Sequence, residues 1–202
     1  MSKYLAGRAA PSIAAGGRRI NISLYATAVF LFWLSLYIYV PTLPNYVQTK
    51  TGSLAVVGIV LAQYGLWQAI LRLPLGITAD SVGWHKPFIV IGFGFAAFGA
   101  VILAQAEGTT QLATGRAVTG LAAATWVPLV VVFTGLFKPH ETVRATAMLT
   151  FIGTSGRVLA TSVTGALNEL GGYALAFFLA AGAAVLAILI VLPAQSLSLI
   201  HI

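Results

Sequence analysis

A short charged hinge between two apolar runs carries the side chains best suited to chemistry. The hinge begins at Arg72 and reads RLPLGITADSVGWHKP. Asp80 falls at the end of the first run, where its carboxylate can cap the next helix or pair with a cation that moves during a conformational change. Gly76 lies one helical turn earlier and lets a neighbouring helix approach closely, while Gly83 permits the tight turn. Lys86 begins the second run. The hinge is a candidate gate, and an ordinary capped loop is the alternative.

Two more arginines lie inside apolar runs. Arg116 is about five residues, or about 8 Å at helical rise, from one end of its run. Arg157 lies near the middle of its run. An arginine within a membrane span is costly unless it finds water, headgroups or a partner. Arg116 can snorkel to the headgroups, but Arg157 is too deep to do so with ease.

No acidic residue matches the depth of Arg157 in the sequence. All four acids lie at the ends of the apolar runs or between them: Asp80, Glu107, Glu141 and Glu169. The partner of Arg157 is therefore water, a carbonyl group, a substrate anion, or an acid outside these residues.

Aromatic and amide side chains recur on single helical faces. Trp33 shares a face of the first apolar run with other aromatic residues, and Tyr64 and Gln68 share a face of the second. Such groups beside a cavity can bind an organic solute, and helix packing is the alternative. The candidates for a substrate cavity or coupling site are Trp33, Tyr64, Gln68, Arg116, Gly120 and Arg157.

The composition indicates which elements must position these residues. Of 202 residues, 59% are hydrophobic and 7% are charged, whereas a soluble domain carries about 25% charged residues. Such a chain must sit in a lipid bilayer. The cations are not massed on one soluble face, which argues against nucleic-acid binding. There is no cysteine, which excludes disulfides and cysteine-ligated metals, and we expect neither a metal nor a cofactor.

Six apolar runs are each long enough to cross a hydrocarbon core of about 30 Å. They are residues 22–44, 54–79, 87–106, 111–137, 143–168 and 172–193. Because the connections are short, neighbouring spans must be antiparallel. We therefore predict an all-α membrane protein with a basic tail over 1–21 and a six-helix unit over 22–193. The tail over 194–202 is unlike a natural domain end, and we expect a truncated or foreign sequence there.

Basic residues predict the orientation of the spans. Seven lie on the side of the N-terminus: Lys3, Arg8, Arg18, Arg19, Lys86, Lys138 and Arg144. Lys50 lies on the opposite side. The positive-inside rule then places both termini in the cytoplasm, with the spans in a prokaryotic plasma membrane.

The hinge spacing Gly-x-x-x-Asp-x-x-Gly-x-x-Lys resembles the signature between the second and third helices of major facilitator superfamily transporters. The spacing from Arg116 to Gly120 is similar to the Arg-x-x-x-Gly motif in the fourth helix of the same superfamily. One position departs from the pattern. Members often carry a basic residue directly after the second glycine, where this chain has Trp84. His85 or Lys86 can supply the charge one or two places later.

The resemblance covers nearly all of residues 20–193 and implies one six-helix half of a twelve-helix carrier. The C-terminal half is then the missing partner. Carriers of this kind move small solutes by alternating access, and each half consists of two inverted three-helix repeats. Under that scheme the fifth span mirrors the second. Gly165 and Glu169 become the counterparts of Gly76 and Asp80 on the outer face.

The charges within the spans favour one class of substrate. Three arginines without a matching acid indicate an anionic or polar small organic solute, moved by a secondary transporter. The alternative within the superfamily is multidrug efflux by proton antiport, which needs a titratable acid in the membrane. Antiporters of the superfamily often carry a Gly-Pro pair in the fifth helix, where this chain reads Gly156-Arg157. A membrane scaffold without transport is a further alternative, but it gives the arginines no use.

Residues 153–156 also fit the Gly-x-Ser-Gly nucleophile motif of rhomboid intramembrane proteases. A serine nucleophile needs a base to take its proton. The three histidines lie in connections or beyond the last span: His85, His140 and His201. None of these positions can reach a serine in the middle of the fifth span, so we predict a transporter and not an enzyme.

Overall fold

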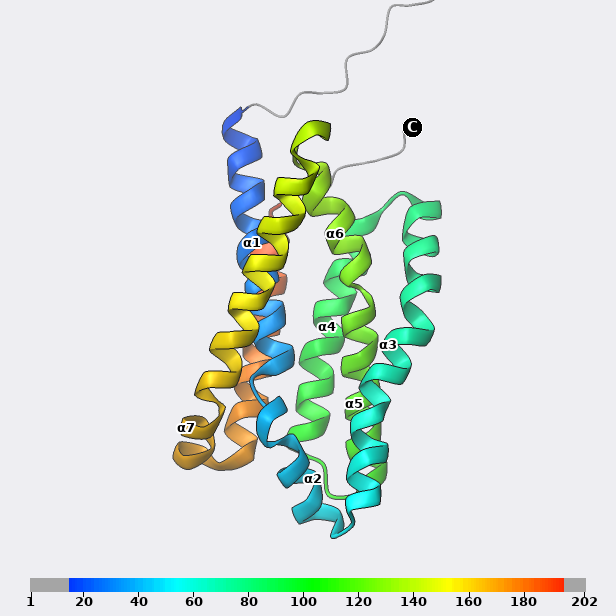
Figure 1. The fold of residues 1–202 in the computed structure, drawn as a ribbon, viewed down its shortest axis with the longest axis vertical. Helices are drawn as coiled ribbons and strands as arrows, with labels where there is room; N and C mark the ends of the chain where they lie inside the picture. Colours follow the sequence, from blue (N-terminus) through cyan, green and yellow to red (C-terminus); the bar gives the residue numbers. More distant parts are fainter. Residues whose placement is uncertain (1–14, 195–202) are drawn as a thin grey trace, which may run out of the picture.

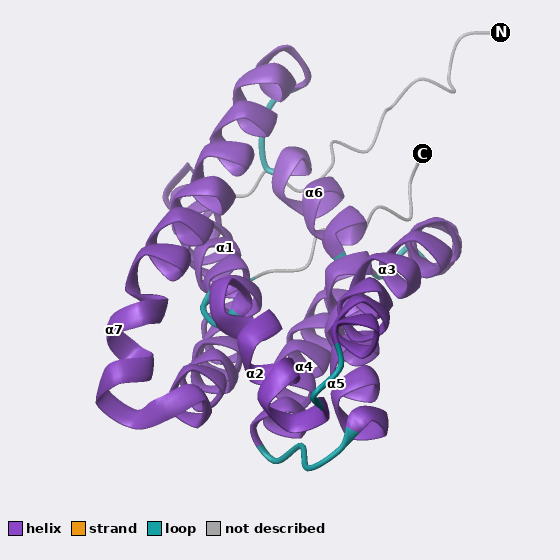
Figure 2. Ribbon diagram, turned by 60° about the horizontal axis from the view of Figure 1, so that its bottom comes forward, coloured by secondary structure: helices purple, strands orange, loops and turns teal. Residues whose placement is uncertain are grey.

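The computed structural model describes residues 15–194. This part of the chain consists of helices joined by short turns, with no strand (Figures 1 and 2). The α-helices are α1 (Ala15–Tyr37), α2 (Leu43–Thr51), α3 (Leu54–Val82), α4 (His85–Ala104), α5 (Thr109–Ala124), α6 (Trp126–Gly135) and α7 (Thr142–Val191). Two short 3₁₀ helices lie at Val40–Thr42 and Pro139–Glu141. In both views α7 and α3 lie on opposite sides of the bundle.

Five segments of the described chain are long and apolar enough to cross a membrane. This confirms the prediction of an all-α membrane protein. The last segment, residues 139–191, is 53 residues long. A continuous helix of about 50 residues would measure about 75 Å, more than twice the thickness of a hydrocarbon core of about 30 Å.

The long helix α7 contains a break that explains its length. Gly171 and Gly172 have non-helical backbone angles, and Gly172 has φ 66°. In Figure 1 the chain turns back on itself at this end of α7, so that its yellow first part and its orange second part run in opposite directions. A residue with positive φ is best supplied by glycine. The pair therefore divides α7 into two antiparallel pieces.

Two prolines interrupt the predicted spans 22–44 and 111–137. A proline within a helix clashes with the carbonyl group four residues earlier and donates no hydrogen bond to it. Counting back four residues from Pro41 gives Tyr37, where α1 ends, and from Pro128 gives Ala124, where α5 ends. The prolines near residue 41 predict the first break. The second, between α5 and α6, is a finding of the structure.

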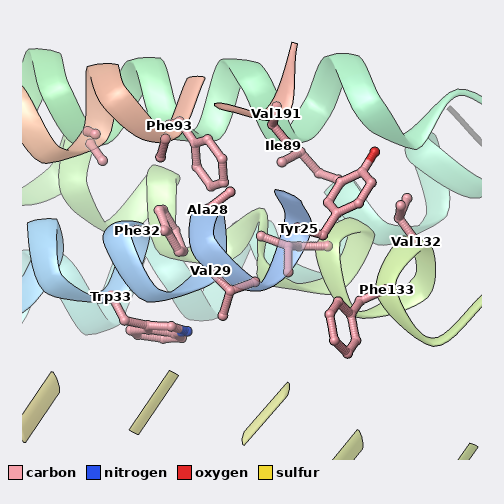
Figure 3. Packing of buried hydrophobic residues seen from close by; sticks show 14 of the residues in the cluster. Tyr25, Ala28, Val29, Phe32, Trp33, Ile89, Phe93, Val132, Phe133 and Val191 are labelled. Atoms are coloured by element: carbon pink, nitrogen blue, oxygen red, sulfur yellow. The ribbon is translucent and has the colours of Figure 1, made fainter. Parts of the chain in front are cut away.

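The core lies around α1. Tyr25, Phe32 and Leu36 are fully buried there. Figure 3 shows Phe32 directed toward Phe93 of α4, and the two ring centroids are 5.0 Å apart. In the same view Trp33 points to the other side of α1. The central helix therefore packs on two faces, one against α4 and one against the first part of α7.

Most of the cations outside the spans gather at one end of the bundle, which we call the basic end. Arg18 donates from Nη2 to Glu141 Oε2 at 2.8 Å and from Nε to the Leu136 carbonyl at 2.6 Å. Lys86 donates to the carbonyl groups of Leu192 and Ala194. These contacts join the start of α1, the α6–α7 connection, the hinge and the end of α7.

The opposite end carries Lys50 in the last turn of α2, Glu107 between α4 and α5, and Glu169 beside the break in α7. Helix α1 begins at Ala15, so the last residues of the predicted 1–21 tail are helical. The earlier residues of that tail, and residues 195–202 of the predicted 194–202 tail, lie outside the described part of the chain.

Candidate substrate site and hinge

The hinge is a two-residue turn between α3 and α4. Helix α3 ends at Val82, and Gly83 takes the left-handed conformation with φ 71°. Its backbone N–H donates to the carbonyl groups of Ala79 and Asp80. A side chain at this φ would be strained, so glycine suits the position. The short turn fixes Asp80 at the end of one helix close to the start of the next.

Asp80 pairs with His85 across this turn. His85 Nε2 and Asp80 Oδ1 are 2.9 Å apart. The histidine is 3% exposed, whereas the aspartate side chain is 65% exposed. Lys86 points elsewhere, to the carbonyl groups at the end of α7. Of the two residues that could replace the missing basic residue at Trp84, it is His85 that contacts the carboxylate. His85 was not among the candidate site residues of the sequence.

A shallow groove runs along α3 beside the hinge. It has a volume of about 440 Å³, and Arg72, Gly76, Asp80 and Val127 are among its lining residues. A Cβ at Gly76 would lie 3.3 Å from Val127 Cγ1, so this glycine sits at a close contact between α3 and α6. Arg72 is exposed. The groove therefore brings Arg72, Gly76 and Asp80 onto one surface. The Asp80 carboxylate is paired with His85 and not with Arg72.

Arg157 lies against aromatic rings of α1. Its guanidinium carbon is 4.1 Å from the centre of the Trp33 ring and 5.6 Å from that of Tyr37. Its Nε donates to the Gly153 carbonyl at 3.4 Å. A cation over an aromatic face is stabilised by the ring quadrupole. Of the partners that the sequence left open, the structure supplies a carbonyl, and it adds two rings.

Two glycines of α7 make room for this contact. A Cβ at Gly153 would lie 2.7 Å from Trp33 Cδ1, and a Cβ at Gly156 would lie 2.6 Å from the Phe30 carbonyl oxygen. Both distances are below van der Waals contact, so only glycine fits there. Ser155 donates its hydroxyl to the Phe151 carbonyl at 2.9 Å. The Gly-x-Ser-Gly sequence is thus a helix-packing motif.

Arg116 has a similar arrangement on α5. It is 6% exposed, and its guanidinium carbon lies 4.6 Å from the centre of the Tyr64 ring. Because the side chain is buried among helices, it does not snorkel to the helix end. A Cβ at Gly120 would lie 2.5 Å from the Tyr64 carbonyl oxygen, so this glycine brings α5 against α3. The nitrogens Nε and Nη1 of Arg116 are buried without a hydrogen-bond partner among the described residues.

The two arginines belong to one group of side chains, which we call the arginine–aromatic cluster. Its members are Trp33, Tyr37, Tyr64, Arg116, Trp126 and Arg157. Tyr64 of α3 stacks on Arg116, and Trp33 and Tyr37 of α1 stack on Arg157. Trp126 stands edge-on to Trp33, with ring centroids 5.1 Å apart. Four helices and the start of a fifth thus contribute to one site.

The remaining predicted residues lie apart from this cluster or at its margin. Gln68 is half-buried on α3, one turn after Tyr64. Gly165 and Glu169 are exposed near the break in α7, at the far end of the bundle from Asp80. Tyr37 is one of the aromatic residues that the sequence places on the same helical face as Trp33, whereas sequence reasoning missed Trp126 as a member of the cluster. Trp126 follows the break at Thr125, and the proline two residues later was the signal that could have drawn attention to it.

The comparisons with known proteins agree with this architecture. The family described as Major Facilitator Superfamily matches residues 25–196. The chain belongs to this superfamily. It is therefore a transporter-family protein and not an enzyme, and the protease interpretation falls away.

Two curated relatives are similar in sequence to part of the chain. An inner membrane transport protein, YajR, of Escherichia coli (strain K12) is 36% identical over 106 residues, which are 52% of this chain and 23% of the relative. An uncharacterized transporter of Buchnera aphidicola subsp. Schizaphis graminum (strain Sg) is 27% identical over 112 residues, which are 54% of this chain and 28% of the relative. The matched segments thus span about a quarter of each relative's length.

Proposed function

We propose that this chain is the N-terminal six-helix half of a twelve-helix secondary transporter, which moves a small organic anion across the plasma membrane by alternating access. The substrate site is the arginine–aromatic cluster, and a C-terminal half supplies its other wall. The single observation that carries the proposal is the pair of guanidinium groups deep in the helices, with aromatic rings and no carboxylate beside them. Uncompensated charge in a membrane is costly, so an anionic solute is the natural ligand.

The proposed helix arrangement is two inverted three-helix repeats. The first consists of α1 with α2, then α3 and α4. The second consists of α5 with α6, then the two parts of α7 on either side of Gly171 and Gly172. In support, Asp80 and Glu169 then end the second helix of each repeat, at opposite ends of the bundle. The basic end faces the cytoplasm in this proposal, because cytoplasmic ends carry an excess of Lys and Arg.

Proton-coupled multidrug efflux is the alternative within the superfamily. It requires a titratable acid within the membrane. Among residues 15–194, every Asp and Glu lies at a helix end or in a connection. The alternative therefore depends on an acid in the other half of the carrier. The anion proposal draws on side chains that this half already places together.

Substitution of Arg157 tests the proposed function. In the full-length protein reconstituted into liposomes, we expect Arg157→Met to lower the affinity for organic carboxylates at least about tenfold, since it removes the charge. Arg157→Lys should restore part of that affinity, because lysine keeps the charge but not the planar guanidinium. Binding is measured with a panel of radiolabelled small carboxylates and their neutral amides.

Arg144→Met is the matched control for this experiment. Arg144 is an exposed arginine of the same helix at the basic end, so its loss should leave affinity unchanged. The proposal is wrong if Arg157→Met is well expressed and binds carboxylates as tightly as the parent protein. It is also wrong if neutral amides bind as well as the carboxylates.

A further inference from the structure

We infer that the arginine–aromatic cluster selects anions that carry an aromatic ring next to the charged group, so that a benzoate-like solute binds better than an aliphatic acid of the same size. This inference rests on the proposed function. It narrows the organic anion of the proposed function to one substrate class.

The unpaired groups of the cluster indicate the charged part of the ligand. Arg116 Nε and Nη1 are buried and have no acceptor among the described residues. Both are N–H groups that can donate but cannot accept. A buried donor without an acceptor is unfavourable. A ligand that fits them must therefore bring acceptor oxygens, as a carboxylate or sulfonate does.

The rings of the cluster indicate the rest of the ligand. Trp33 covers the guanidinium of Arg157 at 4.1 Å, and Tyr64 covers that of Arg116 at 4.6 Å. Each guanidinium group therefore lies against an aromatic side chain. Guanidinium groups stack on aromatic faces as well as pairing with carboxylates. A ligand with a planar ring next to its carboxylate can therefore stack on a guanidinium through the ring and pair with it through the carboxylate oxygens.

Half-buried rings extend this surface beyond the arginines. Tyr37, Tyr64 and Trp126 are each partly exposed, and Trp126 and Tyr37 both contact Trp33 edge-on or at a tilt. Aromatic pairs in such offset or edge-to-face arrangements gain more interaction free energy than the buried area alone provides. A saturated ring of the same size would bury similar area and lose that gain.

Three probes separate the ring from the charge. Benzoate carries both, cyclohexanecarboxylate keeps the charge on a saturated ring, and benzamide keeps the aromatic ring without the charge. Equilibrium binding of radiolabelled benzoate to the purified full-length protein is measured, and the other two compounds compete for it. We expect benzoate to bind about tenfold more tightly than cyclohexanecarboxylate. Benzamide should compete at least about tenfold more weakly than benzoate.

Tyr37→Leu tests whether the cluster itself provides this selectivity. The substitution should lower the ratio of the benzoate affinity to the cyclohexanecarboxylate affinity from about ten to about one. Phe98→Leu is the control, because Phe98 is 59% exposed on α4 and lies outside the cluster. The Phe98→Leu variant should prefer benzoate over cyclohexanecarboxylate to the same extent as the parent protein. A monodisperse size-exclusion profile of each variant shows that it is folded.

The possible outcomes distinguish the inference from the proposed function. Equal binding of the two carboxylates, with benzamide weak, overturns the aromatic selectivity and leaves the anion transporter standing. Equal binding of benzoate and benzamide overturns both. A benzoate preference that survives Tyr37→Leu shows that the selectivity lies elsewhere in the carrier, and it overturns the assignment to this cluster. Absence of benzoate binding to the parent protein overturns the inference alone, because the carboxylate panel tests the proposed function separately.

Discussion

At the scale of single residues, Arg116 and Arg157 each lie against an aromatic ring, at a place where a glycine lets two helices approach. Trp33 lies under Arg157 because Gly153 leaves space for the indole, and Tyr64 lies under Arg116 because Gly120 lets the two helices touch. Cation–π contacts at desolvated sites are worth about 2 kcal/mol or more. They lower the cost of a charge in the membrane without neutralising it, which leaves the charge available to a ligand.

The hinge carboxylate provides a prediction at the same scale. Asp80→Asn should leave the protein folded, because the Asp80 side chain is 65% exposed and the amide oxygen of asparagine can still accept a hydrogen bond from His85. Transport should fall about tenfold, since a shift of only about 1.4 kcal/mol in the inward–outward equilibrium changes populations by that factor. Initial uptake rates in proteoliposomes are compared with the thermal unfolding midpoint of the same sample.

Glu107→Gln serves as the control for that experiment. Glu107 is a carboxylate in a connection at the opposite end of the bundle, so its neutralisation should change neither quantity. Normal uptake by the Asp80→Asn variant would remove the hinge carboxylate from the mechanism.

At the scale of elements, the helices depend on where prolines end them and where glycines let them approach. Pro128 ends α5 at Ala124, and Thr125 fills the break with its hydroxyl donated to the Ala122 carbonyl at 2.7 Å. Gly92 of α4 receives this threonine, because any Cβ at position 92 would overlap its side chain. The break between α5 and α6 is therefore held in place by the contact of Thr125 with Gly92 of α4.

A matched pair of glycine substitutions on α4 tests this packing. Gly92→Ala should destabilise the protein by about 1–3 kcal/mol, the usual cost of overpacking a tight contact. Gly94→Ala should be neutral or stabilising by up to about 1 kcal/mol, because a Cβ at position 94 meets nothing within 4 Å. Thermal unfolding in detergent measures both. Equal midpoints for the two variants would show that Thr125 is not held by α4.

At the scale of the whole molecule, the charges define two unlike ends. Arg18, Lys86, Lys138 and Arg144 lie at the basic end, and Lys50 lies at the other. In Figure 1 the start of α1 and the end of α7 lie at the same end of the bundle. The positive-inside rule predicts that this end is cytoplasmic.

Cysteine labelling tests the orientation, and these 202 residues contain no cysteine to interfere. Single cysteines are placed at Gln48, Ser81, Thr109 and His140, all of them exposed. In intact cells an impermeant thiol reagent should label Gln48→Cys and Thr109→Cys, and leave Ser81→Cys and His140→Cys unlabelled until the cells are opened. The reverse pattern would invert the orientation.

The apolar runs and the break near Pro41 could be predicted from the sequence, because hydrophobicity, length and proline position are local properties of the chain. The same reasoning applied to Pro128 would have located the break in the fourth span.

The partners of the charges could not be predicted. His85 rather than Lys86 reaches Asp80 because of how a two-residue turn directs two adjacent side chains. Arg157 meets Trp33 across more than 120 positions of sequence, and only the packing of α7 against α1 through Gly153 and Gly156 brings them together. Contacts of that kind depend on the shapes of both helices at once, which only the tertiary structure decides.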